Sequence, residues 1–193
     1  MATIKELLES EKIKDVKDLF RSGNKPTIND LNNLLEYALS ESTCLKHPVA
    51  AVIYDMCGDY VELGWNGPPD FMEHDKCLRE GYPSGKGMEL CPGSHAETRA
   101  ISKVAEYNES THNGTIYLSS WFPCVRCADS IKGAGIKRVV TPDEIYEDAE
   151  KKTLVKGLRN QPYNFEMAER VLRKANIEII VDKSIKPAYK KNE

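Results

Sequence analysis

The stretch GSHAETRAI, residues 93–101, predicts the start of a helix that carries His95 and Glu97 two positions apart. Apolar residues at helical spacing continue this pattern over 95–107. The inward face of the predicted helix is formed by Ala96, Ala100, Ile101 and Val104. Taken alone, His95 and Glu97 are either site residues or polar residues at an exposed helix start. The segment that follows in the chain decides between these alternatives.

A pair of cysteines with CxxC spacing follows in the segment FPCVRC, residues 122–127. Residues 115–119 predict a strand, and Pro123 then occupies the first position of a second predicted helix, where its missing N–H is tolerated. Two cysteines in a first helical turn can face one point, and the positive helix N-terminus favours their thiolates. With the two helices side by side, Cys124, Cys127 and His95 supply three zinc ligands. The fourth position then stays open for water, which is typical of a catalytic zinc site.

Glu97 lies too close to His95 along the helix to ligate the same ion without distorting the turn. Its carboxylate can instead take a proton from a zinc-bound water and deliver it to a leaving group. A CxxC pair alone is also typical of redox motifs and structural zinc sites. The combination of H-x-E, one strand and P-C-x-x-C is the signature of zinc-dependent nucleobase deaminases. We therefore predict a catalytic zinc site, with a redox motif, a structural zinc or a decayed site as the alternatives.

Strands and helices alternate over the rest of the chain. Apolar spacing predicts helices over 4–20, from the N-cap Thr27 to about 39, and over 164–175. The second of these carries Leu31, Leu34, Leu35, Ala38 and Leu39 on one stripe. Strands are predicted over 49–54, 60–65, 138–140 and 177–181, the first two as a hairpin, and 143–156 is partly helical. This order predicts an α/β fold with a central sheet covered on both faces. The loop over 66–94 is long enough to indicate a functional role.

The composition is that of a soluble globular protein. The chain has 193 residues, of which 40% are hydrophobic and 30% charged, and its net charge is −3. We expect no membrane span, because no run of about 18 apolar residues occurs. The charged N-terminus does not resemble a secretory signal, so the six cysteines are expected to bind metal or to stay free thiols. The net charge gives no general electrostatic case for nucleic-acid binding.

Several further segments resemble the cytidine and deoxycytidylate deaminase superfamily, and within it the dCMP deaminases. They are STCLKHPVAAVIY (42–54), GWNGPP (64–69), CLREGYPSG (77–85), ELCPGSHAE (89–97), FPCVRCA (122–128) and AGIKRVV (134–140). The resemblance implies a three-layer α/β/α cytidine-deaminase-like fold with a central mixed five-stranded sheet. It implies a deaminase domain over 26–183, preceded by an N-terminal helical extension over 1–25 and followed by a flexible basic tail over 184–193.

The resemblance also implies an activity, the hydrolytic deamination of dCMP to dUMP with release of ammonia, which supplies dUMP for thymidylate synthesis. A zinc-activated water would attack C4 of cytosine, and Glu97 would protonate N3 and then the departing amine. The Ala96 N–H would hold the base carbonyl, and Asn66 the deoxyribose. Phosphate donors would come from the segment 42–47 and from Arg126. The donors suggested in that segment are Ser42, Thr43, Lys46 and His47. Trp121 and Phe122 would either contact the base from the side of the pocket or simply pack beside the strand.

Some positions depart from the family pattern. Arg99 stands where many relatives have asparagine, and Pro48 and Ala50 replace a basic residue and a glycine. The preferred nucleotide is therefore left open between dCMP, dCTP and a modified cytosine nucleotide, while the acidic balance argues against a polynucleotide. A non-catalytic zinc protein is the distant alternative.

The family resemblance extends to cofactors and partners. It allows a second, structural zinc at Cys44, Cys77 and Cys91, near His74. It also allows Mg²⁺ with a nucleotide effector, dCTP or dTTP as effectors, and a homo-oligomer, with a hexamer favoured. The expected location is cytoplasmic.

Overall fold

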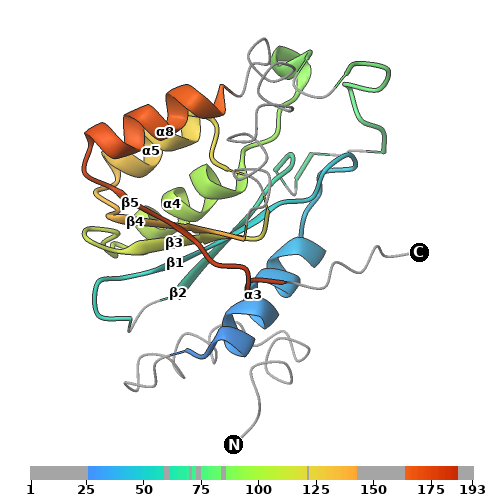
Figure 1. Ribbon diagram of the computed structural model, residues 1–193. Coiled ribbons are helices and arrows are strands. Elements are labelled where there is room, and N and C mark those ends of the chain that lie inside the picture. The colour runs from blue at the N-terminus through green and yellow to red at the C-terminus, as the bar shows by residue number, and fades with distance from the viewer. Residues whose placement is uncertain are drawn as a thin grey trace, which may run out of the picture.

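The chain folds around one mixed sheet of five strands, flanked by helices on both faces (Figure 1). The computed structural model describes residues 26–58, 61–69, 71–72, 75–83, 86–120, 122–142 and 164–186. The strands are β1 (Ala50–Tyr54), β2 (Val61–Trp65), β3 (Thr115–Leu118), β4 (Arg138–Thr141) and β5 (Glu178–Val181). They lie in the order β2-β1-β3-β4-β5, in which β1 is antiparallel to β2 and β3, and β3, β4 and β5 are parallel. The predicted α/β architecture, its hairpin and its five-stranded mixed sheet are confirmed.

One of the described helices covers the first face of the sheet. This helix, α3 (Ile28–Ser40), begins at the predicted N-cap Thr27, whose hydroxyl accepts a bond from the Asp30 N–H at 3.3 Å. The Asp30 carboxylate accepts the Thr27 N–H in return at 2.8 Å, which completes a capping box. All five residues of the predicted apolar stripe are buried. The helical period therefore directs this stripe onto the sheet.

Three of the helices that the structure describes cover the opposite face: α4 (Ala96–Glu106), α5 (Val125–Gly133) and α8 (Phe165–Lys174). Because successive side chains of a strand point to opposite faces of the sheet, one strand can contribute residues to both hydrophobic cores. In β1, Val52 faces the α3 core, whereas Ala51 and Ile53 face the core under the three helices. In β4, Val140 and Val139 divide in the same way. The two hydrophobic cores are thus separated by the sheet, as the predicted two-sided covering requires.

The start of α5 differs from the prediction. Cys124 has an extended backbone and is the N-cap residue, so α5 begins at Val125. The prediction that Pro123 takes the first helical position is wrong by two residues, since Pro123 precedes the cap. Cys124 at the cap and Cys127 in the first turn nevertheless still lie at the helix N-terminus.

Helix α4 approaches strand β2 closely at Gly64. A Cβ at this position would stand 2.7 Å from the Ala100 Cβ and would also collide with the Ala96 carbonyl oxygen. Atoms at such distances must move apart, and the Ala96 backbone is part of the turn that carries His95 and Glu97. Only glycine therefore lets the start of α4 lie directly on β2.

Replacement of Gly64 by alanine is expected to lower the free energy of unfolding by about 1–3 kcal/mol, the usual cost of overpacking. Gly133→Ala is the matched control, because a Cβ there would meet nothing within 4 Å. Urea denaturation of both variants makes the measurement. Equal midpoints for the two variants would contradict the steric argument.

The described chain extends slightly beyond the boundary expected from the sequence. Ile185 is buried in the α3 core, and the Asn32 amide bonds to the Ser184 carbonyl at 3.1 Å and the Lys186 N–H at 2.9 Å. Residues 184–186 therefore pack on α3, where a flexible tail was expected. The helix predicted over 4–20 and the partly helical 143–156 lie outside the described residues.

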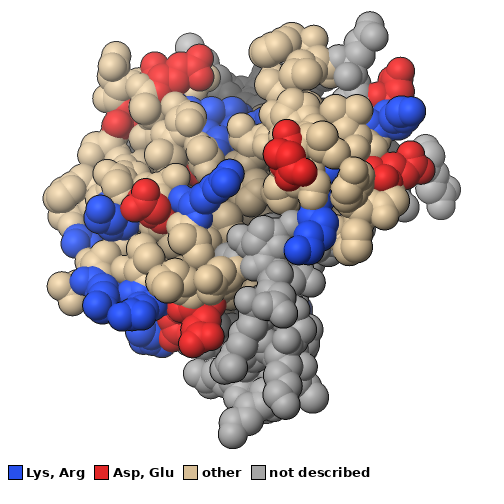
Figure 2. Space-filling view, turned by 90° about the horizontal axis from the view of Figure 1, so that it is seen from above, with Lys and Arg blue, Asp and Glu red and all other residues tan. Residues whose placement is uncertain are grey.

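Two further observations concern the described part of the chain. None of the described helices is long and apolar enough to cross a membrane. On the described part of the face seen in Figure 2, lysine and arginine side chains are interspersed with aspartate and glutamate.

Candidate metal and active site

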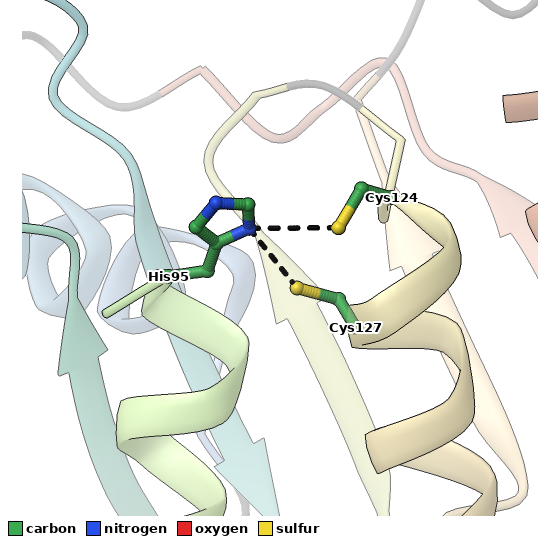
Figure 3. A group of neighbouring side chains, drawn as sticks. All are labelled: His95, Cys124 and Cys127. Atoms are coloured by element: carbon green, nitrogen blue, oxygen red, sulfur yellow. Dashed lines mark hydrogen bonds between the residues drawn. The ribbon is translucent and has the colours of Figure 1, made fainter. Parts of the chain in front are cut away.

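The N-termini of α4 and α5 meet at the carboxyl end of β3 and bring three potential metal ligands together (Figure 3). His95 is the N-cap of α4, and Cys124 and Cys127 come from the start of α5. His95 Nδ1 lies 3.2 Å from Cys127 Sγ and 3.6 Å from Cys124 Sγ. All three ligand atoms lie within 4.8 Å of one another. The sequence prediction placed these three residues together, and the structure does so.

The spacing of these atoms fits tetrahedral zinc. Bonds of about 2.0–2.1 Å to nitrogen and 2.3 Å to sulfur, at a tetrahedral angle, put the N and S atoms about 3.6 Å apart. The two distances from His95 Nδ1 are close to this value. The donor set of one imidazole nitrogen and two thiols is one that zinc prefers. The residues present therefore fit a zinc ion held by three protein ligands.

The thiols already show the charge pattern of a cation site. The hydrogen bond from Cys127 lowers the pKa of Cys124 to about 4, and the hydrogen bond to His95 acts in the same direction. The same Cys124 contact, together with burial, raises the pKa of Cys127. One thiolate therefore forms readily, and the second needs a cation beside it. A divalent metal supplies that cation, and the helix N-terminus favours both thiolates.

Glu97 lies in the first turn of α4 and is 6% exposed. Burial raises the pKa of this carboxyl above its ordinary value, while the neighbouring His95 opposes the shift. Glu97, His95 and Cys124 line one cavity, whereas Cys127 does not. A carboxyl with a raised pKa holds its proton more tightly than an exposed one, which suits a group that accepts and donates protons. The structure thus places a buried carboxyl beside the cysteine–histidine cluster.

Two of the residues predicted to contact the base line the cavity, namely Ala96 and Phe122. Ala96 lines the cavity and is the first residue of α4, so its N–H has no intrahelical acceptor. Phe122 also lines the cavity and makes an edge-to-face contact with Phe165 at 6.4 Å between ring centroids. Phe165 was not singled out from the sequence, because it belongs to α8 and reaches the site only through tertiary folding. Trp121 lies outside the described residues.

Asn66 lines the cavity, but its amide also fastens the neighbouring segment in place. Its Oδ1 accepts bonds from the Val49 N–H at 2.7 Å and the Ser42 hydroxyl at 2.8 Å. Its Nδ2 donates to the His47 carbonyl at 2.7 Å. Ser42 is therefore placed beside Asn66 and does not line the cavity, whereas His47 does. A role for Asn66 in holding a sugar remains a prediction, alongside this positioning role.

Removal of the Asn66 amide is expected to destabilise the protein. In Asn66→Ala the partly buried Val49 N–H loses its acceptor, at about 1–3 kcal/mol for an unsatisfied group, and the exposed His47 carbonyl loses a donor. Ser42→Ala removes only one side of this network and serves as the comparison. Thermal unfolding of both variants should give the larger loss for Asn66→Ala. A loss no larger than that of Ser42→Ala would contradict the positioning role.

The other predicted phosphate donors are divided by the structure. Lys46 lines the cavity, and its ammonium donates to the carbonyls of Arg79 and Tyr82. Thr43 donates to the Pro68 carbonyl at 2.9 Å and does not line the cavity. Arg126 is exposed on α5 and is also absent from the lining. Of the suggested donors, Lys46 and His47 are therefore the ones brought to the cavity.

Arg99, the departure from the family pattern, holds the rim of the cavity. Its guanidinium donates to the carbonyls of Gly67 at 2.7 Å and Pro68 at 3.0 Å. Gly67 and Ser94 exchange backbone hydrogen bonds at 3.1 Å, so this part of the loop is tied to the residue before His95. The predicted functional role of the long loop agrees with this arrangement, since both its ends line the cavity.

Cys44, Cys77 and Cys91 line the same cavity, but they do not form a second metal cluster. Within the described part of the chain, only His95, Cys124 and Cys127 bring their ligand atoms close enough to share an ion. His74 lies outside the described residues. A second structural zinc thus receives no support from the geometry.

Comparisons with known proteins agree with this site. The family model described as "Cytidine and deoxycytidylate deaminase zinc-binding region" matches residues 29–142. The dCMP deaminase of the cyanophage S-TIM5, solved with dCMP and dUMP, is 23% identical with a TM-score of 0.58. That comparison covers 82% of this chain and 99% of the phage protein.

The apo form of the same phage enzyme gives 20% identity, a TM-score of 0.55 and coverage of 80% and 96%. At these identities the structural likeness establishes the fold. No curated protein sequence matches the chain. The family match spans more than half of the chain and contains all three ligand residues and Glu97. The chain therefore belongs to the cytidine and deoxycytidylate deaminase family, and it is a zinc-binding deaminase, a hydrolase of carbon–nitrogen bonds.

Proposed function

We propose that this protein deaminates dCMP to dUMP with release of ammonia, and thereby supplies dUMP for thymidylate synthesis in the cytoplasm. The observation that carries the proposal is the buried Glu97 carboxyl, which lines one cavity with His95 and Cys124 beside the His95–Cys124–Cys127 cluster. The phage dCMP deaminase of similar fold binds dCMP and dUMP, which supports the choice of nucleotide.

The chain's own groups account for the proton transfers of the reaction. His95 Nδ1 and the two cysteine sulfurs would hold zinc, which when bound supplies a nucleophile by lowering the pKa of water. The water oxygen adds to C4 of the cytosine ring, and the C4–N4 bond breaks. Glu97 takes one proton from the attacking water and places it on N3, and it then takes the second proton from the C4 hydroxyl and delivers it to the departing amine. The Ala96 N–H donates to the carbonyl of the base, and Phe122 limits access of bulk water.

The test is a substrate panel on zinc-loaded protein. The panel contains cytidine, dCMP, CMP, dCTP, 5-methyl-dCMP and dAMP, each followed by chromatography of products and by ammonia release. We expect dCMP to give dUMP and ammonia in equal amounts with the highest kcat/KM. No ammonia from any cytosine nucleotide would reject the enzymatic function.

A second candidate is a deaminase of dCTP or of a modified dCMP. It is favoured by the presence of two cationic side chains, Lys46 and Arg79, in the cavity lining, since they offer charge for more than one phosphate. A higher kcat/KM for dCTP or 5-methyl-dCMP in the panel would select it. The interspersed charges in Figure 2 offer no continuous basic track on that described face, which favours a mononucleotide over a polynucleotide.

The proposal includes regulation by dCTP and dTTP, with Mg²⁺ accompanying the nucleotide, and a hexameric assembly. These features rest on the family resemblance. Repeating the panel with dCTP or dTTP as effector, and measuring molar mass by light scattering in both conditions, tests them together. Unchanged kinetics and a monomeric mass would remove both.

A further inference from the structure

Arg79 places a buried positive charge in the wall of the cavity. It lies in a turn of the long loop, where Tyr82 N–H bonds to its carbonyl at 3.1 Å, and its side chain lines the same cavity as Glu97. Arg79 is only 8% exposed. Its Nε donates to the Lys86 carbonyl at 2.9 Å. No described residue accepts a hydrogen bond from its two terminal nitrogens.

A guanidinium in this position is costly unless an anion joins it. Removing an ion from water costs several kcal/mol when no opposite charge compensates. Among the described residues that line the cavity, Glu97 is the one carboxylate, and it lies beside the cysteine–histidine cluster. The described residues form no ion pair with Arg79. The missing partner is therefore expected to be an anionic ligand of the cavity.

Lys46, in the segment between α3 and β1, holds the turn of Arg79 in place. Its Nζ donates to the Tyr82 carbonyl at 2.6 Å and the Arg79 carbonyl at 3.4 Å, so it holds the turn that carries Arg79. It also adds a second positive charge to the cavity lining. Both cations therefore act on whatever part of a ligand reaches this wall, and the turn is fixed in place before the ligand binds.

We propose that Arg79 binds the 5′-phosphate of the nucleotide and is the residue by which the protein selects nucleotides over nucleosides. The inference rests on the proposed function, because it assumes that the base occupies the same cavity near Glu97. Two parallel N–H donors of a guanidinium match two phosphate oxygens, which a lysine cannot reproduce. The phosphate would supply the anionic partner that the Arg79 guanidinium does not have among the described residues.

Binding of the product separates this proposal from turnover. The dissociation constants of dUMP, deoxyuridine and inorganic phosphate are measured by calorimetry on zinc-loaded wild type, Arg79→Gln and Arg79→Lys. We expect Arg79→Gln to weaken dUMP binding by about 10- to 100-fold, because charge-assisted hydrogen bonds are lost. Deoxyuridine should bind all three proteins alike, and Arg79→Lys should lie between the other two.

Arg173→Gln is the matched control, since it removes the same charge from an exposed site on α8 where the arginine pairs with Glu169. It should leave dUMP binding unchanged. Thermal unfolding of the ligand-free variants checks that they are folded. If Arg79→Gln is strongly destabilised, the dUMP affinity of Arg79→Lys, which keeps the charge, becomes the deciding measurement. Inorganic phosphate that binds as tightly as dUMP would identify an anion site without a nucleotide, and would overturn the proposal.

The two proposals fail in different ways. If Arg79→Gln binds dUMP as well as wild type does, the role of Arg79 is wrong even where dCMP is deaminated. If dUMP binding depends on Arg79 but dCMP yields no ammonia, the phosphate site stands and the proposed reaction falls. With turnover present, the ratio of kcat/KM for dCMP to that for deoxycytidine should drop by the same factor as the dUMP affinity.

Discussion

Replacement of Glu97 by glutamine is expected to reduce the rate of dCMP deamination by about 10²–10⁴-fold, the range that general acid–base catalysis contributes. The amide keeps the size of the carboxyl but can neither accept the proton of the attacking water nor pass it to N3 and the amine. Glu97 is not one of the three clustered ligand atoms, so zinc content should stay at the wild-type level. Steady-state kinetics and elemental analysis of the same preparation make the measurement.

The fold should tolerate this substitution. Burial raises the pKa of Glu97, so the folded protein binds its proton more tightly than the unfolded chain does. In the metal-free protein this carboxyl therefore costs stability as the pH rises through and above the unfolded value of 4.5. Glu97→Gln removes that cost, and the metal-free variant should be at least as stable as wild type at neutral pH.

Glu106→Gln, at the exposed last residue of α4, is the control and should keep normal kinetics. A Glu97→Gln or Glu97→Ala variant that retains more than about a few per cent of wild-type activity would contradict the proton-transfer role, given the size of the effect expected for such a group.

The elements with a strong apolar period could be predicted from the sequence. The stripe on α3 and the N-cap at Thr27 were predicted residue by residue, because the helical period and the capping box are local signals. The metal ligands could also be predicted, since His95 and the CxxC pair each lie at a helix start whose position follows from the adjacent strand. The start of α5 was misplaced because proline at N1 and proline before an N-cap have similar local signals.

The remainder of the cavity could not be predicted from the same signals. Asn66 and Arg99 act mainly on backbone carbonyls and N–H groups, and such contacts leave no period in the sequence. Arg79 lies in a loop without periodicity, so its burial emerges only when the loop folds over the site. Phe165 joins the cavity from a distant helix. These residues are therefore the ones for which the structure adds most to the functional hypothesis.

Replacement of Cys127 by serine is expected to abolish both zinc binding and turnover. A serine hydroxyl is a poor substitute for a thiolate as a zinc ligand, and only His95 and Cys124 would be left. Since outer-sphere partners of a metal ligand already affect affinity by about 10–100-fold, loss of a direct ligand should cost at least about 100-fold. Elemental analysis after dialysis should show zinc in wild type and little in Cys127→Ser.

The response to a chelator distinguishes loss of metal from loss of fold. Because a metal that binds only the folded state stabilises it, removal of zinc should lower the melting temperature of wild type. In Cys127→Ser a chelator should have no effect, since the bound metal is already lost. Cys57→Ser, at an exposed thiol between β1 and β2, should behave as wild type. A Cys127→Ser variant with full zinc occupancy would contradict the three-ligand site, because His95 and Cys124 alone would then suffice.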